Sequence, residues 1–225
     1  MAFLHDNLNI NPIKLPVETD ANGIRFYTSP AGLKYPSVTT ALGCMDSVWL
    51  ASWKAKVGEK EAARVGAYAA NRGKIVHFQL ERYLQNQEIE WMRLMPDVRC
   101  LLKSILPALT NINSIVLQET QLYSDTLRLA GTADLICYWQ NKLKVVDFKT
   151  SVEYKRDMPG YLAQVAGYAK MFTERYGYEI LETEVIVGIE SGKPAQVVCG
   201  NVEKDLSYLI EARDVWETKG CIHRQ

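Results

Sequence analysis

Residues 114–151, SIVLQETQLYSDTLRLAGTADLICYWQNKLKVVDFKTS, decide the fold. Three runs rich in β-branched and aromatic residues follow one another here, over 114–124, 127–139 and 142–151, and such runs are typical of strands. Gln140-Asn141 separates the last two runs and favours a tight turn. We therefore expect three consecutive antiparallel strands.

The last two of these strands carry a distinctive set of charged residues. Side chains two residues apart in a strand point to the same face, so Asp147 and Lys149 share one face while Val146 and Phe148 pack on the other. Asp134 and Asp147 lie about equally far from the predicted turn. The pattern therefore predicts that these two carboxylates are close to being cross-strand partners.

Such a carboxylate pair points to metal chemistry. Two neighbouring carboxylates repel each other unless a cation neutralises them or they share a proton. A Mg²⁺ ion takes oxygen ligands and keeps several waters, so two acids and a substrate phosphate suit it. Lys149 would place a positive charge where it stabilises a phosphoryl transition state. The alternative from the residues alone is a solvated hairpin face with a cross-strand salt bridge.

The rest of the chain predicts helices around these strands. Helical spacing of apolar residues predicts helices over 39–45, 48–70, 75–85, 97–112, 160–177 and 202–220. Two more strands are predicted over 180–190 and 195–201, and a hairpin around Ser29-Pro30-Ala31-Gly32. The fold class is α/β, with a mixed central sheet flanked by helices and a helical N-terminal subdomain.

The domain organisation is expected to be one structural unit with an N-terminal arm. We expect residues 1–23 to be the arm, 24–95 a hairpin and helical subdomain, and 96–225 the core. A chain of 225 residues with 48% hydrophobic and 23% charged residues is an ordinary globular protein.

Composition excludes several other classes. The chain has 26 Lys+Arg and 26 Asp+Glu, so it lacks the basic excess that is typical of a nucleic-acid-binding protein. No apolar run is long enough to span a bilayer and the N-terminus does not resemble a signal peptide, so we expect a cytoplasmic protein with no membrane partner. The five cysteines are scattered, with no C-x-x-C pair, so we expect reduced thiols and no iron–sulfur cluster. There is no phosphate-binding loop, so no nucleotide cofactor is expected.

Four motifs in order resemble a known nuclease superfamily. Asp134 and Asp147-Phe148-Lys149 are similar to the PD-(D/E)XK nucleases, in their RecB-like branch. That branch also carries Gly-x-x-x-His on an upstream helix and Gln-x-x-x-Tyr on the helix after the catalytic strand, as in Gly73–His77 and Gln164–Tyr168 here. The resemblance implies a restriction-endonuclease-like core. Ala133 stands where the superfamily name has proline.

A narrower resemblance covers roughly residues 24–190. Tyr35–Thr40, Arg72-Gly73, Gly131–Asp134 and Asp147–Ser151 are similar to phage-encoded exonucleases related to the mitochondrial genome maintenance exonuclease. In a phage-encoded protein, the compartment would be the host cytoplasm.

The resemblance implies roles for the residues of these motifs. It implies one or two Mg²⁺ or Mn²⁺ ions, with the ligands Asp134, Asp147, His77 and, by position only, Glu119. The catalytic set it implies is Asp134, Asp147, Lys149, Gln164 and Tyr168. From its sequence alone, His77 also fits an ordinary buried or surface histidine, and Glu81 shares its helical face as a partner that would orient the ring.

The substrate path is predicted from cations, hydroxyls and aromatic residues near the motifs. The candidate DNA contacts are Ser37, Thr39, Trp53, Arg72, Lys74, Thr150 and Ser151. Aromatic residues interleaved with cations stack bases and bind phosphates, although the tryptophans fit core positions equally well. Arg72 and Lys74 are placed just before a predicted helix, where free amides would add phosphate donors.

Together these expectations describe a divalent-metal-dependent DNA exonuclease that favours single-stranded or frayed ends, with a possible replication or recombination partner. Two alternatives stay open. One is an endonuclease of the same superfamily that acts on duplex or branched DNA. The other is an inactive module that binds DNA without cutting it.

Overall fold

A mixed sheet of six strands forms the centre of the computed structural model, which describes residues 2–6, 8–45 and 47–219. The strands are β1 (Leu4–His5), β5 (Ile112–Ser124), β6 (Leu129–Trp139), β7 (Lys142–Ser151), β8 (Glu182–Ile189) and β9 (Gln196–Asn201), in that spatial order. Strands β5, β6 and β7 are antiparallel neighbours, as predicted. The pairs β1–β5 and β7–β8 are parallel, which makes the sheet mixed.

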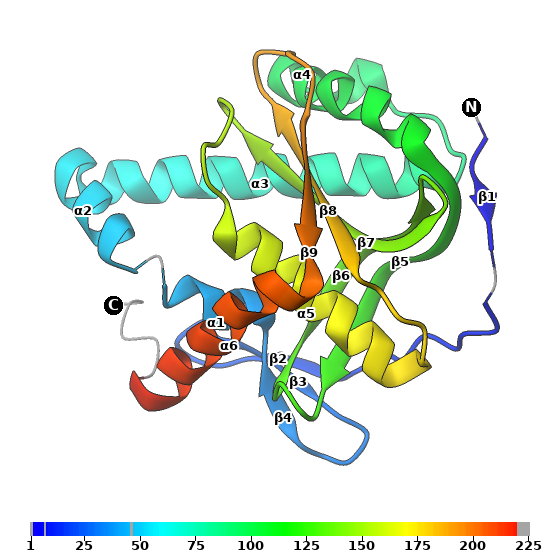
Figure 1. The fold of residues 1–225 in the computed structure, drawn as a ribbon. Helices are drawn as coiled ribbons and strands as arrows, with labels where there is room; N and C mark the ends of the chain where they lie inside the picture. Colours follow the sequence, from blue (N-terminus) through cyan, green and yellow to red (C-terminus); the bar gives the residue numbers. More distant parts are fainter. Residues whose placement is uncertain (1, 7, 46, 220–225) are drawn as a thin grey trace.

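Helices cover both faces of this sheet (Figure 1). On one face lie α1 (Val38–Gly43), α5 (Pro159–Tyr176) and α6 (Val202–Lys219), whose buried residues pack with Val145 and Val185 of the sheet. On the other face lie α3 (Glu59–Leu84) and α4 (Pro96–Ile105), which pack with Val146 and Phe148. The alternation along β7 therefore separates the two cores as the sequence pattern predicts.

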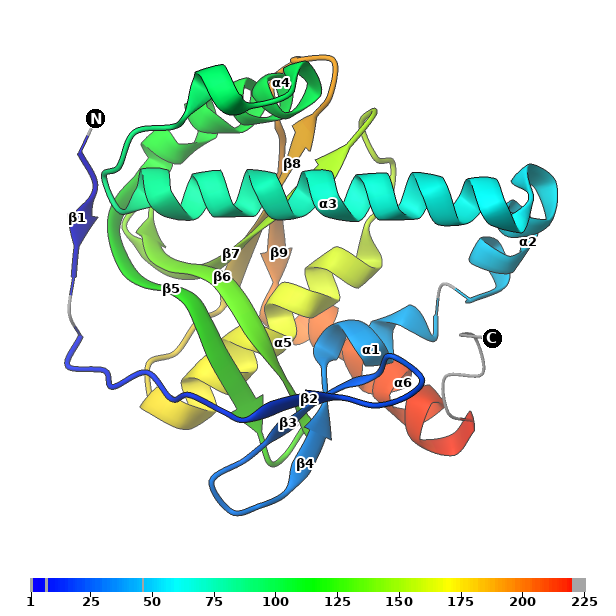
Figure 2. The same cartoon turned by 180° about the vertical axis from the view of Figure 1, so that it is seen from behind.

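A smaller antiparallel sheet precedes the helices. It contains β2 (Val17–Thr19), β3 (Arg25–Thr28) and β4 (Lys34–Pro36), and the β3–β4 pair is the predicted hairpin. The segment expected to be an arm thus contributes β1 to the main sheet and β2 to the small one. Figure 2 shows the small sheet lying across the end of β5 and β6.

Helix α3 corrects one prediction about the N-terminal third. The predicted break before residue 75 is wrong, because α3 runs without interruption through Gly66 and Gly73. The chain breaks instead at Gly58, between α2 (Ser47–Val57) and α3, where φ is +84°. Glycine adopts this left-handed conformation without steric cost. The sequence also predicts that Asp46 caps the helix expected over 48–70, but Asp46 lies outside the described residues.

The remaining boundaries agree with the predictions within a few residues. Helix α4 ends at Ile105 and continues as a 3₁₀ helix, η2 (Leu106–Asn111), which contains Pro107. A proline lacks the backbone N–H of a regular helix, and the sequence predicts an end or a kink there. A second 3₁₀ turn, η1 (Trp91–Arg93), precedes α4.

The cysteines agree only in part with the prediction of reduced thiols. Cys100, Cys137 and Cys199 are free, whereas Cys44 takes part in a disulfide. Within the described ranges, no helix has the length and apolar character that crossing a membrane requires.

Candidate metal and catalytic site

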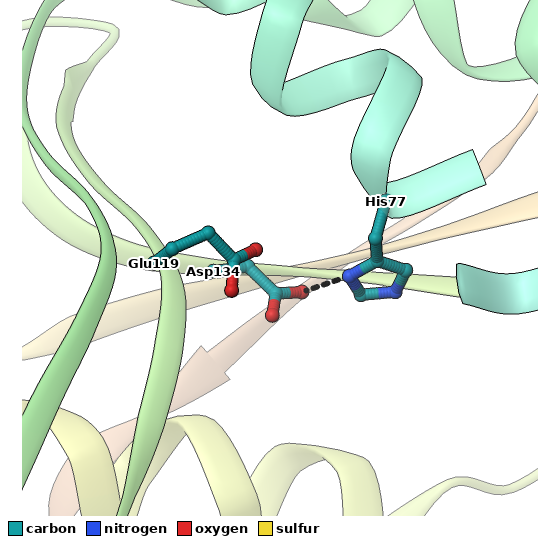
Figure 3. A group of neighbouring side chains, drawn as sticks. All are labelled: His77, Glu119 and Asp134. Carbon is teal, nitrogen blue, oxygen red and sulfur yellow. Dashed lines mark ion pairs between the residues drawn. The ribbon is translucent and has the colours of Figure 1, made fainter. Parts of the chain in front are cut away.

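Three side chains from different elements converge beside the sheet (Figure 3). His77 comes from α3, Glu119 from β5 and Asp134 from β6, and one ligand-type atom from each lies within 4.8 Å of the others. His77 Nδ1 is 3.4 Å from Asp134 Oδ2, which also accepts the backbone N–H of Phe148 at 2.9 Å. The group thus joins a residue of α3 to two residues of the β5–β6 pair, which lie more than 30 residues further along the chain.

Glu119 owes its place to the register of β5 and β6. Gln118 pairs with Leu135 and Thr120 pairs with Ala133, so Glu119 falls opposite Asp134. Glu119 also has φ +44°, a left-handed conformation that is costly for a residue with a side chain. A strained residue inside a strand is more common at functional sites than elsewhere.

A second group of residues adjoins the first. Asp147 is 1% exposed, and Lys149 Nζ lies 2.5 Å from its Oδ2. Gln164 Nε2 donates to Asp147 Oδ1 at 2.9 Å and to Tyr168 Oη at 3.4 Å. The two members of the Gln-x-x-x-Tyr motif share one face of α5, because they are one helical turn apart. Gln164 thus holds the buried carboxylate in place.

The sheet register brings the two predicted aspartates into neighbouring positions. Leu135 pairs with Val146, so Asp134 and Asp147 occupy the next position along β6 and β7. Asp147 is not a member of the group that lies within 4.8 Å, however, and its contacts in the structure are Lys149 and Gln164. Its role as a metal ligand stays a prediction.

The charges of the site perturb one another strongly. Burial disfavours protonated His77, but the Asp134 carboxylate outweighs burial and raises the pKa of His77 to about 9. Desolvation at the cavity wall, with repulsion from Asp134, raises the pKa of Glu119 to about 7. Burial raises the pKa of Asp147 to about 6, although Lys149 opposes the shift. Burial also opposes the charge on Lys149, but Asp147 and Asp134 raise its pKa. Clustered perturbations of this kind are typical of functional sites.

All these side chains line one cavity of about 550 Å³, which we call the main cavity. Of the predicted site residues, it is lined by His77, Glu119, Asp134, Asp147, Lys149, Gln164, Tyr168, Lys74, Ser37 and Thr39. Ser37 also caps α1 by accepting the backbone N–H of Thr40. The structure therefore brings the predicted metal and catalytic residues together in one place.

Four predicted DNA contacts lie elsewhere. Arg72 is 7% exposed and its guanidinium forms an ion pair with Glu190 at 2.5 Å, so it is occupied within the protein. Arg72 and Lys74 lie in the middle of α3, where backbone amides bond to carbonyls of the same helix. The free amides expected at a helix start are therefore not found at these two residues. Trp53, Thr150 and Ser151 do not line the main cavity either.

Sequence reasoning missed several residues of the cavity wall. Arg25 and Tyr27 of β3 line it, and Tyr27 Oη lies 3.3 Å from Thr132 Oγ1. Their alternation in a predicted hairpin indicated a strand but not where that strand would lie. Phe78, 54% exposed on α3, also lines the cavity and was not singled out.

Comparisons with known proteins give two distant relatives. The chain is 27% identical over 206 residues to "Mitochondrial genome maintenance exonuclease 1" of Xenopus tropicalis, covering 83% of this chain and 59% of that protein. It is 25% identical to the protein of the same name from Mus musculus, covering 85% of this chain and 56% of that protein. The chain thus spans a little over half the length of these relatives. No family model matches it.

Among solved structures, the crystal structure of SSO0001 aligns with a TM-score of 0.42 at 16% identity, over 81% of this chain and 76% of that one.

The donor set at the site fits a divalent cation. Carboxylate oxygens suit Mg²⁺ and Mn²⁺, whereas an imidazole nitrogen suits transition metals. Two carboxylates with one histidine therefore fit Mn²⁺ or Mg²⁺. The mixed donor set favours Mn²⁺ in affinity.

Proposed function

We propose that this chain is a divalent-metal-dependent DNA exonuclease that favours single-stranded or frayed ends. The observation that carries the proposal is the meeting of His77, Glu119 and Asp134 beside the Asp147–Lys149 pair in one cavity. The exonuclease names of the two relatives, which match over most of this chain, support DNA as the substrate. The motif order supports assignment to the RecB-like branch of the PD-(D/E)XK nucleases.

The ligands in this proposal are His77, Glu119 and Asp134, with Asp147 as a further acid. A Mg²⁺ or Mn²⁺ ion bound there supplies Lewis-acid activation of a water and neutralises charge on the scissile phosphate. His77 must be neutral to be a ligand, so its proton is lost when the ion binds.

Lys149 contributes a permanent positive charge. Its raised pKa keeps the ammonium protonated at neutral pH, where it faces the place of negative charge development at the phosphate. The Asp147 carboxylate holds this ammonium, and Gln164 in turn holds Asp147. Tyr168, 3% exposed, supports Gln164 from one helical turn away. This chain of contacts keeps Lys149 oriented before substrate binds.

The main cavity offers a path for the strand. Lys74 is placed on the same wall as His77 to bind a phosphate, and Thr39 presents an exposed hydroxyl at the start of α1. The Ser37 hydroxyl is buried and bonds to Thr39 and Thr40, so it supports this wall from behind. Phe78 presents an exposed ring for stacking against a base. Single-stranded DNA, whose bases are free to stack, suits such a wall better than a paired duplex.

A cleavage assay tests the proposal. Linear single-stranded, linear duplex and circular single-stranded DNA, labelled separately at the 5′ and 3′ ends of the linear forms, are incubated with Mg²⁺, Mn²⁺ or EDTA. We expect linear DNA to be shortened only with metal, and Lys149→Ala to remove cleavage. Lys170→Ala is the matched control, because Lys170 is an exposed lysine of α5 outside the main cavity.

Each outcome separates the alternatives. Cleavage of circular DNA would identify an endonuclease instead. Retention of DNA without cleavage in either metal would identify a binding module. Metal-dependent cleavage that survives in Lys149→Ala would show that the proposed catalytic role is wrong.

A further inference from the structure

A second cavity of about 500 Å³ adjoins the main one. The two share Thr39 and Gln164 as wall residues, so they are immediate neighbours. The second cavity extends past the start of α5, where its wall includes Lys155, Asp157, Tyr161 and Tyr208. A polymer bound at the proposed metal site would therefore have the second cavity beside its next unit.

Tyr161 lines the second cavity, and two lysine ammonium groups lie near its ring. Lys149 Nζ is 5.3 Å from the centre of the Tyr161 ring, and Lys155 Nζ is 5.5 Å from the same centre. Both distances are within the range of cation–π attraction. One half-buried ring thus positions the lysine of the metal site and the lysine of the second cavity.

The backbone of Lys155 is held in place independently. Its N–H donates to Gln196 Oε1 at 2.9 Å, and its carbonyl accepts from Gln196 Nε2 at 2.8 Å. Gln196 begins β9, so a strand of the main sheet fixes the loop between β7 and α5. Fixing the backbone of an otherwise irregular loop reduces the conformational entropy that Lys155 loses when it binds a ligand.

We propose that the second cavity binds the phosphodiester adjacent to the cleaved one, with Lys155 as its cation and Tyr161 as the residue that positions both lysines. The inference rests on the proposed nuclease function and extends it to a second phosphate of the same strand. Asp157 on the same wall carries the opposite charge and weakens the binding of that phosphate.

Salt dependence and neutral substrates test the role of Lys155. In binding of a single-stranded oligonucleotide, Lys155→Gln reduces the slope of log affinity against log salt by about 0.7, the value for one lost phosphate contact. Asp157→Asn has the opposite effect and tightens binding. Lys193→Gln leaves the slope unchanged. Lys193 is the matched control because its Nζ lies 6.0 Å from the ring of Tyr154, outside both cavities.

Substrates with one methylphosphonate, a neutral linkage, locate the contact. In the wild type, a methylphosphonate next to the cleaved linkage slows single-turnover cleavage about fivefold, the upper end for one accessible ion pair. Lys155→Gln slows cleavage of the unmodified strand by the same factor and is insensitive to the methylphosphonate at that linkage.

Tyr161 is tested by its ring. Tyr161→Leu removes the cation–π contact of both lysines and lowers kcat while raising KM, whereas Tyr161→Phe keeps the ring and restores both parameters. A purely structural role for Tyr161 would change stability in Tyr161→Leu without this split.

The two proposals fail in different ways. If the wild type cleaves DNA while Lys155→Gln keeps both the salt slope and the methylphosphonate profile of the wild type, the second cavity is not a phosphate site and the nuclease proposal stands. If the wild type cleaves no DNA, the nuclease proposal is wrong, and an unchanged salt slope in Lys155→Gln then overturns this inference as well.

Discussion

Substitution of Gly131 by alanine should destabilise the protein through a single contact in the site. An alanine Cβ there would lie 2.7 Å from Cε1 and 2.8 Å from Oη of Tyr168. Tyr168 is 3% exposed, so its ring cannot move into solvent. Overpacking of this kind costs about 1–3 kcal/mol, and alanine in place of glycine in a strand recovers about 0.5–1 kcal/mol. The expected net loss in the free energy of unfolding therefore lies between about 0 and 2.5 kcal/mol.

Urea unfolding followed by circular dichroism measures this loss, and a double-mutant cycle assigns it. In a Tyr168→Leu background the ring atoms that meet the new Cβ are gone, so Gly131→Ala should cost nothing or stabilise. Because Tyr168 supports Gln164 and through it Asp147, the single variant should also lose cleavage activity. An equal cost of Gly131→Ala in both backgrounds would refute the reasoning.

Three further predictions concern other parts of the molecule. Gly66→Ala should raise the free energy of unfolding by up to about 1 kcal/mol, since Gly66 lies inside α3 with open space around it; an unchanged urea midpoint would contradict this. The Mn²⁺ affinity measured by calorimetry should rise with pH until about pH 9, because His77 has a pKa of about 9 without metal and must lose its proton to bind the ion. In His77→Gln, the slope of log affinity against pH should fall by about one proton per ion. Lys144→Met should lower the free energy of unfolding in urea by about 3–5 kcal/mol, because the buried carboxylate of Glu184, 4% exposed, loses the ammonium that lies 2.8 Å away. Adding Glu184→Leu should restore most of that free energy.

The local pattern of the sequence was sufficient to predict strands β5 to β9 and the face that carries the chemistry. Alternation along β7 places Asp147 and Lys149 opposite Val146 and Phe148, and the structure has the same division. This works because the direction of a side chain in a strand depends only on its position in the pleat. The two members of the Gln-x-x-x-Tyr motif meet for a similar reason, since one turn of helix separates them.

Glycine shows where local reasoning failed. The predicted helix over 48–70 runs through Gly58 and the predicted break lies at Gly73, but it is Gly58 that has the left-handed backbone, and Gly73 is an ordinary helical residue. Glycine permits both conformations, so its presence does not determine which one the chain adopts. The same error put Lys74 at a helix start, whereas it lies in a helix interior in the structure.

Contacts between distant segments were decided by the tertiary structure alone. Arg72 was a reasonable phosphate contact until the fold placed Glu190, 118 residues away, against its guanidinium. Glu119 could be ranked only by position, because its approach to His77 depends on how α3 crosses the sheet and on the register of β5. Side-chain periodicity is a property of each element, whereas the pairing of elements depends on the packing of the whole core, and the sequence pattern of one element contains no record of it.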